Sequence, residues 1–126
     1  KSILDRVKAR RAVKLNVSGA FHSPLMAPAA AEFQQVLDSV SFDNASVPVL
    51  SNVEPEPATD ANILKQRLVA QMTGSVRWRE IALRLLQEGI DTVVEIGPGN
   101  VLTGLIKRTC SDLALKNVAS VADLPQ

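Results

Sequence analysis

A strand pattern, a glycine-rich turn and the start of a helix follow one another in the stretch Thr92-Val93-Val94-Glu95-Ile96-Gly97-Pro98-Gly99-Asn100-Val101-Leu102. Its first part, Thr92–Ile96, is β-branched and almost continuously apolar, which predicts a central strand buried on both faces. The Gly-Pro-Gly sequence then turns the chain into a helix that we expect over residues 100–109. Helices that alternate with short strands predict an α/β layer with parallel strands.

The first part of the chain predicts a helix, a strand and a second helix. Ser2 is expected to cap the first helix, and residues 13–17 alternate apolar with polar side chains, as a half-buried strand does. Gly19 ends this strand. Pro28 is expected as the first residue of an amphipathic helix. The apolar residues of that helix follow at helical spacing: Phe33, Val36, Leu37 and Val40.

The middle and the end of the chain predict two strands, a loop and two helices. Residues 47–50 are expected to form a short buried strand, and the proline-containing residues 52–59 a loop. Asp60 is expected to cap a helix that Gly74 ends. The next helix is expected to start at Ser75, to carry its apolar stripe on Trp78, Ile81, Ala82, Leu85 and Leu86, and to close at Gly89. Residues 117–121 are expected to form the last strand.

The composition is that of one globular domain. The chain has 126 residues, of which 46% are hydrophobic, enough for one hydrophobic core. Its 14 basic and 13 acidic residues leave a net charge of +1, which argues against broad nucleic-acid binding. No apolar run approaches the roughly 18 residues that a membrane-spanning helix needs, so we expect no membrane association.

The cysteine content and the first residues carry further expectations. Cys110 cannot form an internal disulfide and fits a reducing compartment, so we expect a cytoplasmic protein with a packed thiol here. The chain opens on Lys1 rather than Met, so we expect it to be part of a longer protein. Basic residues crowd its start and either dock an acidic partner or form a solvated helix face. They are Lys1, Arg6, Lys8, Arg10, Arg11 and Lys14.

His22 is the strongest candidate for a catalytic residue. It is the only histidine, and it lies between the end of a predicted strand and the start of a predicted helix. Its imidazole can take and return a proton near neutral pH, as a general base must. The nearest serines, Ser18 and Ser23, do not lie in a Gly-x-Ser-x-Gly elbow. We expect no metal site, because there is no second histidine or cysteine pair.

The glycine-rich turn after Glu95 is a second candidate. It lacks the Lys-Ser/Thr ending of a P-loop and the glycine spacing of a dinucleotide fingerprint, so a tight strand-to-helix turn is the favoured interpretation. A nucleotide-binding α/β domain that uses Gly97, Pro98 and Gly99 remains a weaker alternative.

Three segments together resemble the malonyl-CoA:acyl carrier protein transacylases of fatty acid synthesis, which are akin to polyketide synthase acyltransferase domains. Gly19-Ala20-Phe21-His22-Ser23-Pro24-Leu25-Met26 is similar to the segment that carries the family's catalytic histidine. Gln71-Met72-Thr73-Gly74-Ser75-Val76-Arg77-Trp78 is similar to its Gln-x-x-x-x-Val-x-Trp segment. Residues 95–105 are similar to its Glu-x-Gly-Pro-Gly-x-Val-Leu-x-Gly-Leu segment.

The resemblance implies roles for three residues. His22 would be the general base that activates a serine hydroxyl, and this serine lies outside the chain, as do the oxyanion-hole donors and the arginine that pairs with the malonate carboxylate. The backbone carbonyl of Gln71 would orient His22. Phe21 would crowd the α-carbon of the acyl group and favour malonyl over methylmalonyl.

The resemblance also implies the fold and the partners. Residues 1–17 would end a small ferredoxin-like subdomain, and residues 18–126 would form the C-terminal portion of a large hydrolase-like, parallel-sheet acyltransferase subdomain. Malonyl-CoA and acyl carrier protein would be the partners, with the CoA thioester as substrate, no cofactor and a monomeric complete enzyme. The chain alone would be inactive. A catalytically inactive carrier-protein-binding or regulatory fragment of the same fold is the alternative.

Overall fold

The computed structural model describes residues 19–124. The helix predicted from Ser2, the strand predicted over residues 13–17 and the basic cluster at the start of the chain therefore lie outside the described residues, as does Ser18.

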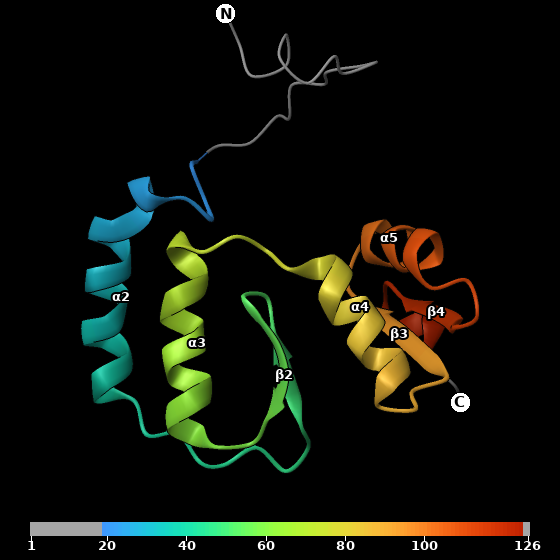
Figure 1. Ribbon diagram of the computed structural model, residues 1–126, viewed down its shortest axis with the longest axis horizontal. Helices are drawn as coiled ribbons and strands as arrows, with labels where there is room; N and C mark the ends of the chain where they lie inside the picture. Colours follow the sequence, from blue (N-terminus) through green and yellow to red (C-terminus); the bar gives the residue numbers. More distant parts are fainter. Residues whose placement is uncertain (1–18, 125–126) are drawn as a thin grey trace, which may run out of the picture.

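Two antiparallel helices form one side of the molecule (Figure 1). A 3-10 turn, η1 (Pro24–Met26), leads into α2 (Ala27–Ser39), which begins one residue before Pro28 and buries Ala30 and Leu37. The second helix, α3 (Ala61–Thr73), packs along α2. The Asp60 side chain accepts a hydrogen bond from the Ile63 N–H, which confirms it as the N-cap, and Gly74 directly follows the last residue of α3.

A β-hairpin lies against α3, where the sequence predicted a strand followed by a loop. β1 (Val49–Ser51) pairs antiparallel with β2 (Glu54–Ala58), so the prediction of a loop over residues 52–59 is wrong. Pro55 and Pro57 occupy alternate positions, so their missing N–H groups fall on one edge of β2, which a strand at the rim of a sheet tolerates. The prediction of a buried strand over residues 47–50 is also wrong, because Val47 and Val49 are exposed.

The helix α4 (Trp78–Gln87) contacts both the hairpin and the C-terminal unit. It begins at Trp78 rather than at the predicted Ser75, because residues 75–77 are not helical and the Arg77 N–H donates to the Asn52 carbonyl at 2.7 Å. It buries Ile81 and Ala82, and the chain leaves it through Gly89, which has a φ of 74°.

The C-terminal unit is a strand, a helix and a parallel strand. β3 (Thr92–Ile96), α5 (Val101–Thr109) and β4 (Ala114–Val118) follow one another, and the register pairs Thr92 with Ala114 and Ile96 with Val118. The parallel α/β arrangement and the bounds of β3 agree with the sequence prediction.

Two predictions about this unit are wrong. β4 ends at Val118, three residues earlier than the predicted strand over residues 117–121, and a 3-10 turn, η2 (Val121–Asp123), follows it. Leu113 and Leu115 face the core and thereby set the position of the strand. β3 is not buried on both faces: Val94 is 45% and Ile96 82% exposed. Within residues 19–124 its sheet contains β3 and β4, and α5 packs on them from the face of Val93.

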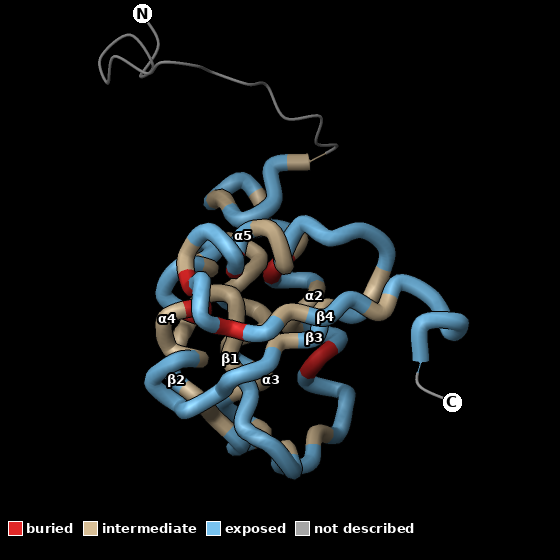
Figure 2. The backbone as a smooth tube through the Cα atoms, turned by 90° about the vertical axis from the view of Figure 1, so that its right-hand side faces the viewer, coloured by how far each residue is buried: buried red, intermediate tan, exposed pale blue. Residues whose placement is uncertain are grey.

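The buried core is small and lies where α4 meets α5 and the parallel strands. Ala82, Ile106, Cys110 and Leu113 form it, with Trp78, Leu83, Val93 and Leu115 packed around it. The Cys110 thiol contacts the Ala82 carbonyl at 3.4 Å, which confirms the prediction of a packed thiol. Figure 2 shows short buried segments along a backbone that is otherwise intermediate or exposed.

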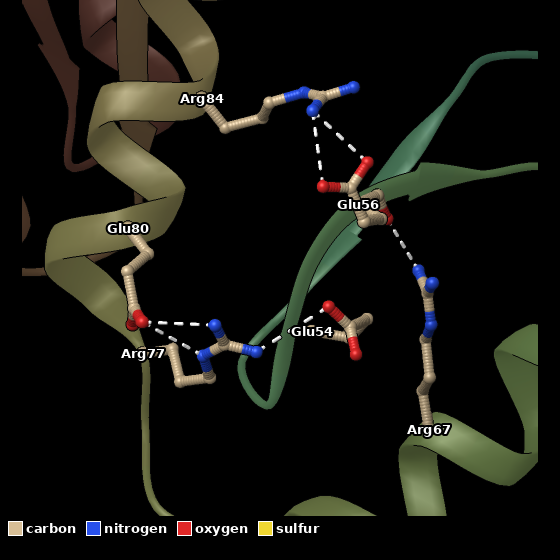
Figure 3. Close-up of polar contacts among 6 residues, drawn as sticks. All are labelled: Glu54, Glu56, Arg67, Arg77, Glu80 and Arg84. Carbon is tan, nitrogen blue, oxygen red and sulfur yellow. Dashed lines mark hydrogen bonds and ion pairs between the residues drawn. The ribbon is translucent and has the colours of Figure 1, made fainter.

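Arginine–glutamate contacts join the hairpin to α4 and α3 (Figure 3). Arg77 contacts Glu54 at 3.5 Å and Glu80 at 3.0 Å, and Arg84 contacts Glu56 at 3.0 Å and Glu88 at 2.7 Å. From α3, Arg67 donates to the Glu56 carbonyl at 2.6 Å. These side chains are partly exposed, so each pair contributes little stability by itself and together they fix the hairpin between the two helices.

Candidate active site

His22 lies in the short segment that precedes η1 and touches the C-terminal end of α3. Its φ of 60° is in the left-handed region, which few non-glycine residues adopt. Its backbone N–H donates to the Met72 carbonyl at 3.2 Å, and Met72 belongs to the last turn of α3, whose carbonyl groups have no helical N–H partner of their own. The left-handed turn therefore places the His22 backbone as a cap on α3.

The imidazole of His22 binds the neighbouring carbonyl of the same helical turn. Its Nδ1 lies 2.8 Å from the Gln71 carbonyl oxygen. A carbonyl oxygen only accepts hydrogen bonds, so Nδ1 must carry the proton and Nε2 of the neutral ring holds the free lone pair. The structure thus brings His22 and Gln71 together in the contact that the family resemblance implies, and it leaves Nε2 available as a base.

The rest of the His22 segment is held by local contacts. The Ser23 hydroxyl donates to the Ala20 carbonyl at 2.7 Å, and the Met26 N–H donates to the Ser23 carbonyl at 3.0 Å. Phe21 is 59% exposed, and its ring covers Gly19 so closely that a Cβ added there would lie 2.9 Å from the ring atom Cε2. Phe21 and His22 therefore share one exposed loop.

The side chain of Gln71 makes a separate contact that the sequence did not predict. Its Oε1 accepts a hydrogen bond from Nδ2 of Asn52, at 3.0 Å, and Asn52 lies in the turn between β1 and β2. No motif singles out Asn52, because its partner stands 19 positions away and only the folded hairpin brings the two together.

The carboxylate of Glu95 caps α5. It accepts hydrogen bonds from the Leu102 N–H at 3.1 Å, from the Thr103 N–H at 2.8 Å and from the Thr103 hydroxyl. The Thr103 hydroxyl above all, and the two N–H groups with it, hold the pKa of Glu95 below its usual value. Because the carboxylate already occupies these N–H groups, the helix end is not open to a phosphate, which argues against nucleotide binding at this turn.

The glycine-rich sequence is the tight strand-to-helix turn that the sequence predicts. Gly97 and Gly99 have φ values of 130° and 92°, which side-chain-bearing residues rarely adopt. The Asn117 side chain of β4 donates to the Gly99 carbonyl at 2.7 Å and ties the turn to the sheet.

Two features of the described residues bear on the kind of site. Within residues 19–124, no group of three or more histidine, cysteine, aspartate or glutamate side chains comes together as a metal ion requires. None of the described helices is long and apolar enough to cross a membrane.

The chain is similar to malonyl CoA-acyl carrier protein transacylases in sequence and in fold. It is 55% identical to that of Synechocystis sp. over 123 residues, which make up 98% of this chain and 42% of the relative. The crystal structure of the Synechocystis transacylase covers 91% of the chain with a TM-score of 0.86, and the match takes up 39% of that structure. No family model matches the chain.

A second solved structure includes a partner. It is a malonyl-transacylase in complex with its type II PKS acyl-carrier protein, 36% identical to this chain, with a TM-score of 0.87 over 94% of the chain and 38% of the transacylase. The chain thus spans about two fifths of the length of the relatives that it matches.

Proposed function

Because this chain matches the C-terminal part of malonyl CoA-acyl carrier protein transacylases along nearly its whole length, we propose that it supplies the histidine half of such an acyltransferase. The complete enzyme would transfer a malonyl group from CoA to the phosphopantetheine thiol of acyl carrier protein. A serine outside this chain would carry the malonyl group between the two.

The proposed chemistry has two symmetrical halves. Nε2 of His22 takes the proton of the serine hydroxyl as its oxygen attacks the malonyl thioester carbonyl, the C–S bond breaks, and the proton passes to the departing CoA thiolate. In the second half, His22 takes the proton of the phosphopantetheine thiol, the sulfur attacks the seryl ester, and the proton returns to the serine oxygen. Acid and base roles alternate on one nitrogen, so no proton is lost.

The observation that carries this proposal is the contact between His22 Nδ1 and the Gln71 carbonyl. A neutral carbonyl can fix the tautomer and the direction of an imidazole, as a carboxylate does in a serine–histidine–aspartate triad. Figure 1 shows the segment before α2 lying at the same end of the molecule as the C-terminal end of α3, which is the arrangement this contact needs.

The test measures malonyl transfer by the full-length protein that carries this chain. We expect His22→Asn to lower kcat by about 10²–10⁴-fold, the usual contribution of a general base. Asparagine tolerates a left-handed backbone, so the variant preserves the turn while it removes the base. Gln66→Ala, at an exposed position of α3, is the control and should retain full transfer.

Transfer of labelled malonyl from CoA to holo carrier protein is the readout, and mass spectrometry of the protein detects the malonyl ester. Near-normal transfer by the folded His22→Asn variant would remove His22 from the proposed role. Carrier binding without any malonyl transfer by the unmodified protein would instead support a catalytically inactive carrier-binding protein.

A further inference from the structure

The side-chain amide of Asn52 holds the residue that orients His22. Gln71 is bound at two atoms: its Oε1 accepts from Asn52 Nδ2 at 3.0 Å, and its carbonyl oxygen contacts His22 Nδ1 at 2.8 Å. One residue therefore links the turn of the hairpin to the proposed catalytic loop, although the two segments are far apart in sequence.

The end of α3 needs such an anchor. The last carbonyl groups of a helix have no N–H from a following turn, so other contacts decide where they point. The hairpin turn packs tightly here: a Cβ added to Gly74 would lie 2.9 Å from the Val53 side chain and from the Ala70 carbonyl. Asn52 and Gln71 are both partly buried, which strengthens their hydrogen bond and makes an unpaired amide costly.

The attachment of the hairpin itself does not depend on the Asn52 side chain. The backbone carbonyl of Asn52 accepts a hydrogen bond from the Arg77 N–H at 2.7 Å, and the Arg77 and Arg84 side chains contact the glutamates of β2. Removal of the amide should therefore leave the hairpin in place and release Gln71.

We propose that Asn52 is a positioning residue for the acyl transfer, which acts on His22 through Gln71. This inference rests on the proposed function. It assigns the Asn52 amide the task of holding the Gln71 carbonyl in the direction that the His22 ring requires.

The first experiment measures kcat and KM of the full-length protein. Asn52→Leu keeps the size of the side chain and removes its hydrogen-bonding groups. We expect kcat to fall about 10-fold to 100-fold with little change in KM, as a small misplacement of a catalytic group produces. A merely structural role would lower the amount of folded enzyme and leave kcat per folded molecule unchanged.

Two conservative variants make the test specific for the amide pair. Asn52→Asp should retain most of kcat, because the Gln71 amide can rotate by 180° and donate through Nε2. Gln71→Glu should also retain it, because Asn52 still donates. In the double variant Asn52→Asp/Gln71→Glu, two carboxylate acceptors face each other and neither donates a hydrogen bond. Its kcat should therefore fall to that of Asn52→Leu. This pattern keeps the proposal testable even where Asn52→Leu does not fold.

A second readout reports on the ring itself. The ¹⁵N chemical shifts of the single His22 imidazole, measured by NMR on the 126-residue chain, distinguish a proton on Nδ1 from one on Nε2. We expect the Nδ1–H form to dominate in the unmodified chain and in Asn52→Asp, and to decrease in Asn52→Leu.

Unchanged kcat and an unchanged tautomer in folded Asn52→Leu would overturn the positioning role, as would full activity of the double variant. Either result leaves the proposed function intact as long as His22→Asn lowers kcat as expected above. Loss of the proposed function is recognised separately, by normal transfer in His22→Asn.

Discussion

The Phe21 ring covers Gly19 on the proposed catalytic loop, and this contact allows a test of selectivity. A Cβ at Gly19 would lie 2.9 Å from the ring, so Gly19→Ala should displace it. If the ring crowds the α-carbon of the acyl group, Phe21→Ala should raise the kcat/KM for methylmalonyl-CoA relative to malonyl-CoA by about 10-fold or more, the value of one methyl group. Gly19→Ala should change the same ratio.

The measurement compares the two CoA esters as competing substrates of the full-length protein. Leu25→Ala is the control, because Leu25 lies on the same segment and is 78% exposed. An unchanged ratio in Phe21→Ala would show that the ring only packs against its own loop.

Of the candidate site, the sequence predicted the contact between His22 and the Gln71 carbonyl, and the roles of His22, Gln71 and Phe21 stay predictions. The pattern singled out His22 as a possible base, and the family resemblance supplied Gln71 and Phe21. The contacts of Asn52 and the capping role of Glu95 could not be predicted, because an amide in a turn and a carboxylate at a strand end are compatible with many partners. Only in the folded protein does the Asn52 amide meet Gln71, and the Glu95 carboxylate the backbone of α5.

At the scale of elements, α5 depends on a carboxylate from the strand before it. Hydrogen bonds from Thr103 and Leu102 lower the pKa of Glu95 from its ordinary value of 4.5. A carboxylate whose pKa is lower in the folded state stabilises the fold above the unfolded pKa, and this stabilisation disappears as the pH falls through the folded value. The contribution is therefore complete above about pH 4.5 and is lost on further acidification.

Urea denaturation between pH 7 and pH 3 tests this contribution. At pH values below the ordinary pKa of Glu95, the free energy of unfolding should fall more steeply with falling pH in the unmodified chain than in Glu95→Gln, which has no titrating group at this position. Asp123 and Glu80 also have lowered pKa values, so only the difference between the two proteins isolates Glu95. Thr103→Val removes the hydroxyl donor, so its free energy of unfolding should depend on pH with an intermediate slope. Parallel plots of the free energy of unfolding against pH for all three proteins would contradict the contribution of Glu95.

Among the helices and strands, those with the strongest local sequence patterns were predicted most reliably. The apolar run of β3 and the Asp60 cap of α3 identified those elements because the decisive interactions lie within a few residues. β2 could not be recognised, because Glu-Pro-Glu-Pro-Ala has little strand propensity and forms a strand only where β1 and α4 hold it. The start of α4 was misplaced because the chain first pairs Arg77 with the hairpin.

At the scale of the whole molecule, the free face of β3 is the clearest difference from the sequence prediction. Val94 and Ile96 point to the same side of the strand, away from α5. The relatives are more than twice as long as this chain, so we propose that the rest of a full-length protein covers this face.

Ile96→Ser tests that proposal. In the 126-residue chain the substitution should change the free energy of unfolding by less than about 0.5 kcal/mol, because the side chain is already 82% exposed. In the full-length protein it should cost about 1.5–3 kcal/mol, the value of a buried isoleucine. Ile106→Ala, at a position that is 1% exposed, is the control and should cost about 2–5 kcal/mol in both. Equal small effects of Ile96→Ser in the two proteins would contradict burial of this face.

The attachment of His22 has a consequence for motion. The backbone N–H and the ring of His22 each bind a carbonyl at the C-terminal end of α3, and neither contact involves the buried core around Ile106. Segments with few buried contacts open at a free energy far below that of global unfolding. The loop can therefore detach and return while β3, α5 and β4 stay folded. If His22 is the base that we propose, the rate of acyl transfer scales with the fraction of time that its imidazole spends in place. Substitutions at the end of α3 can then change this rate without touching the reacting atoms.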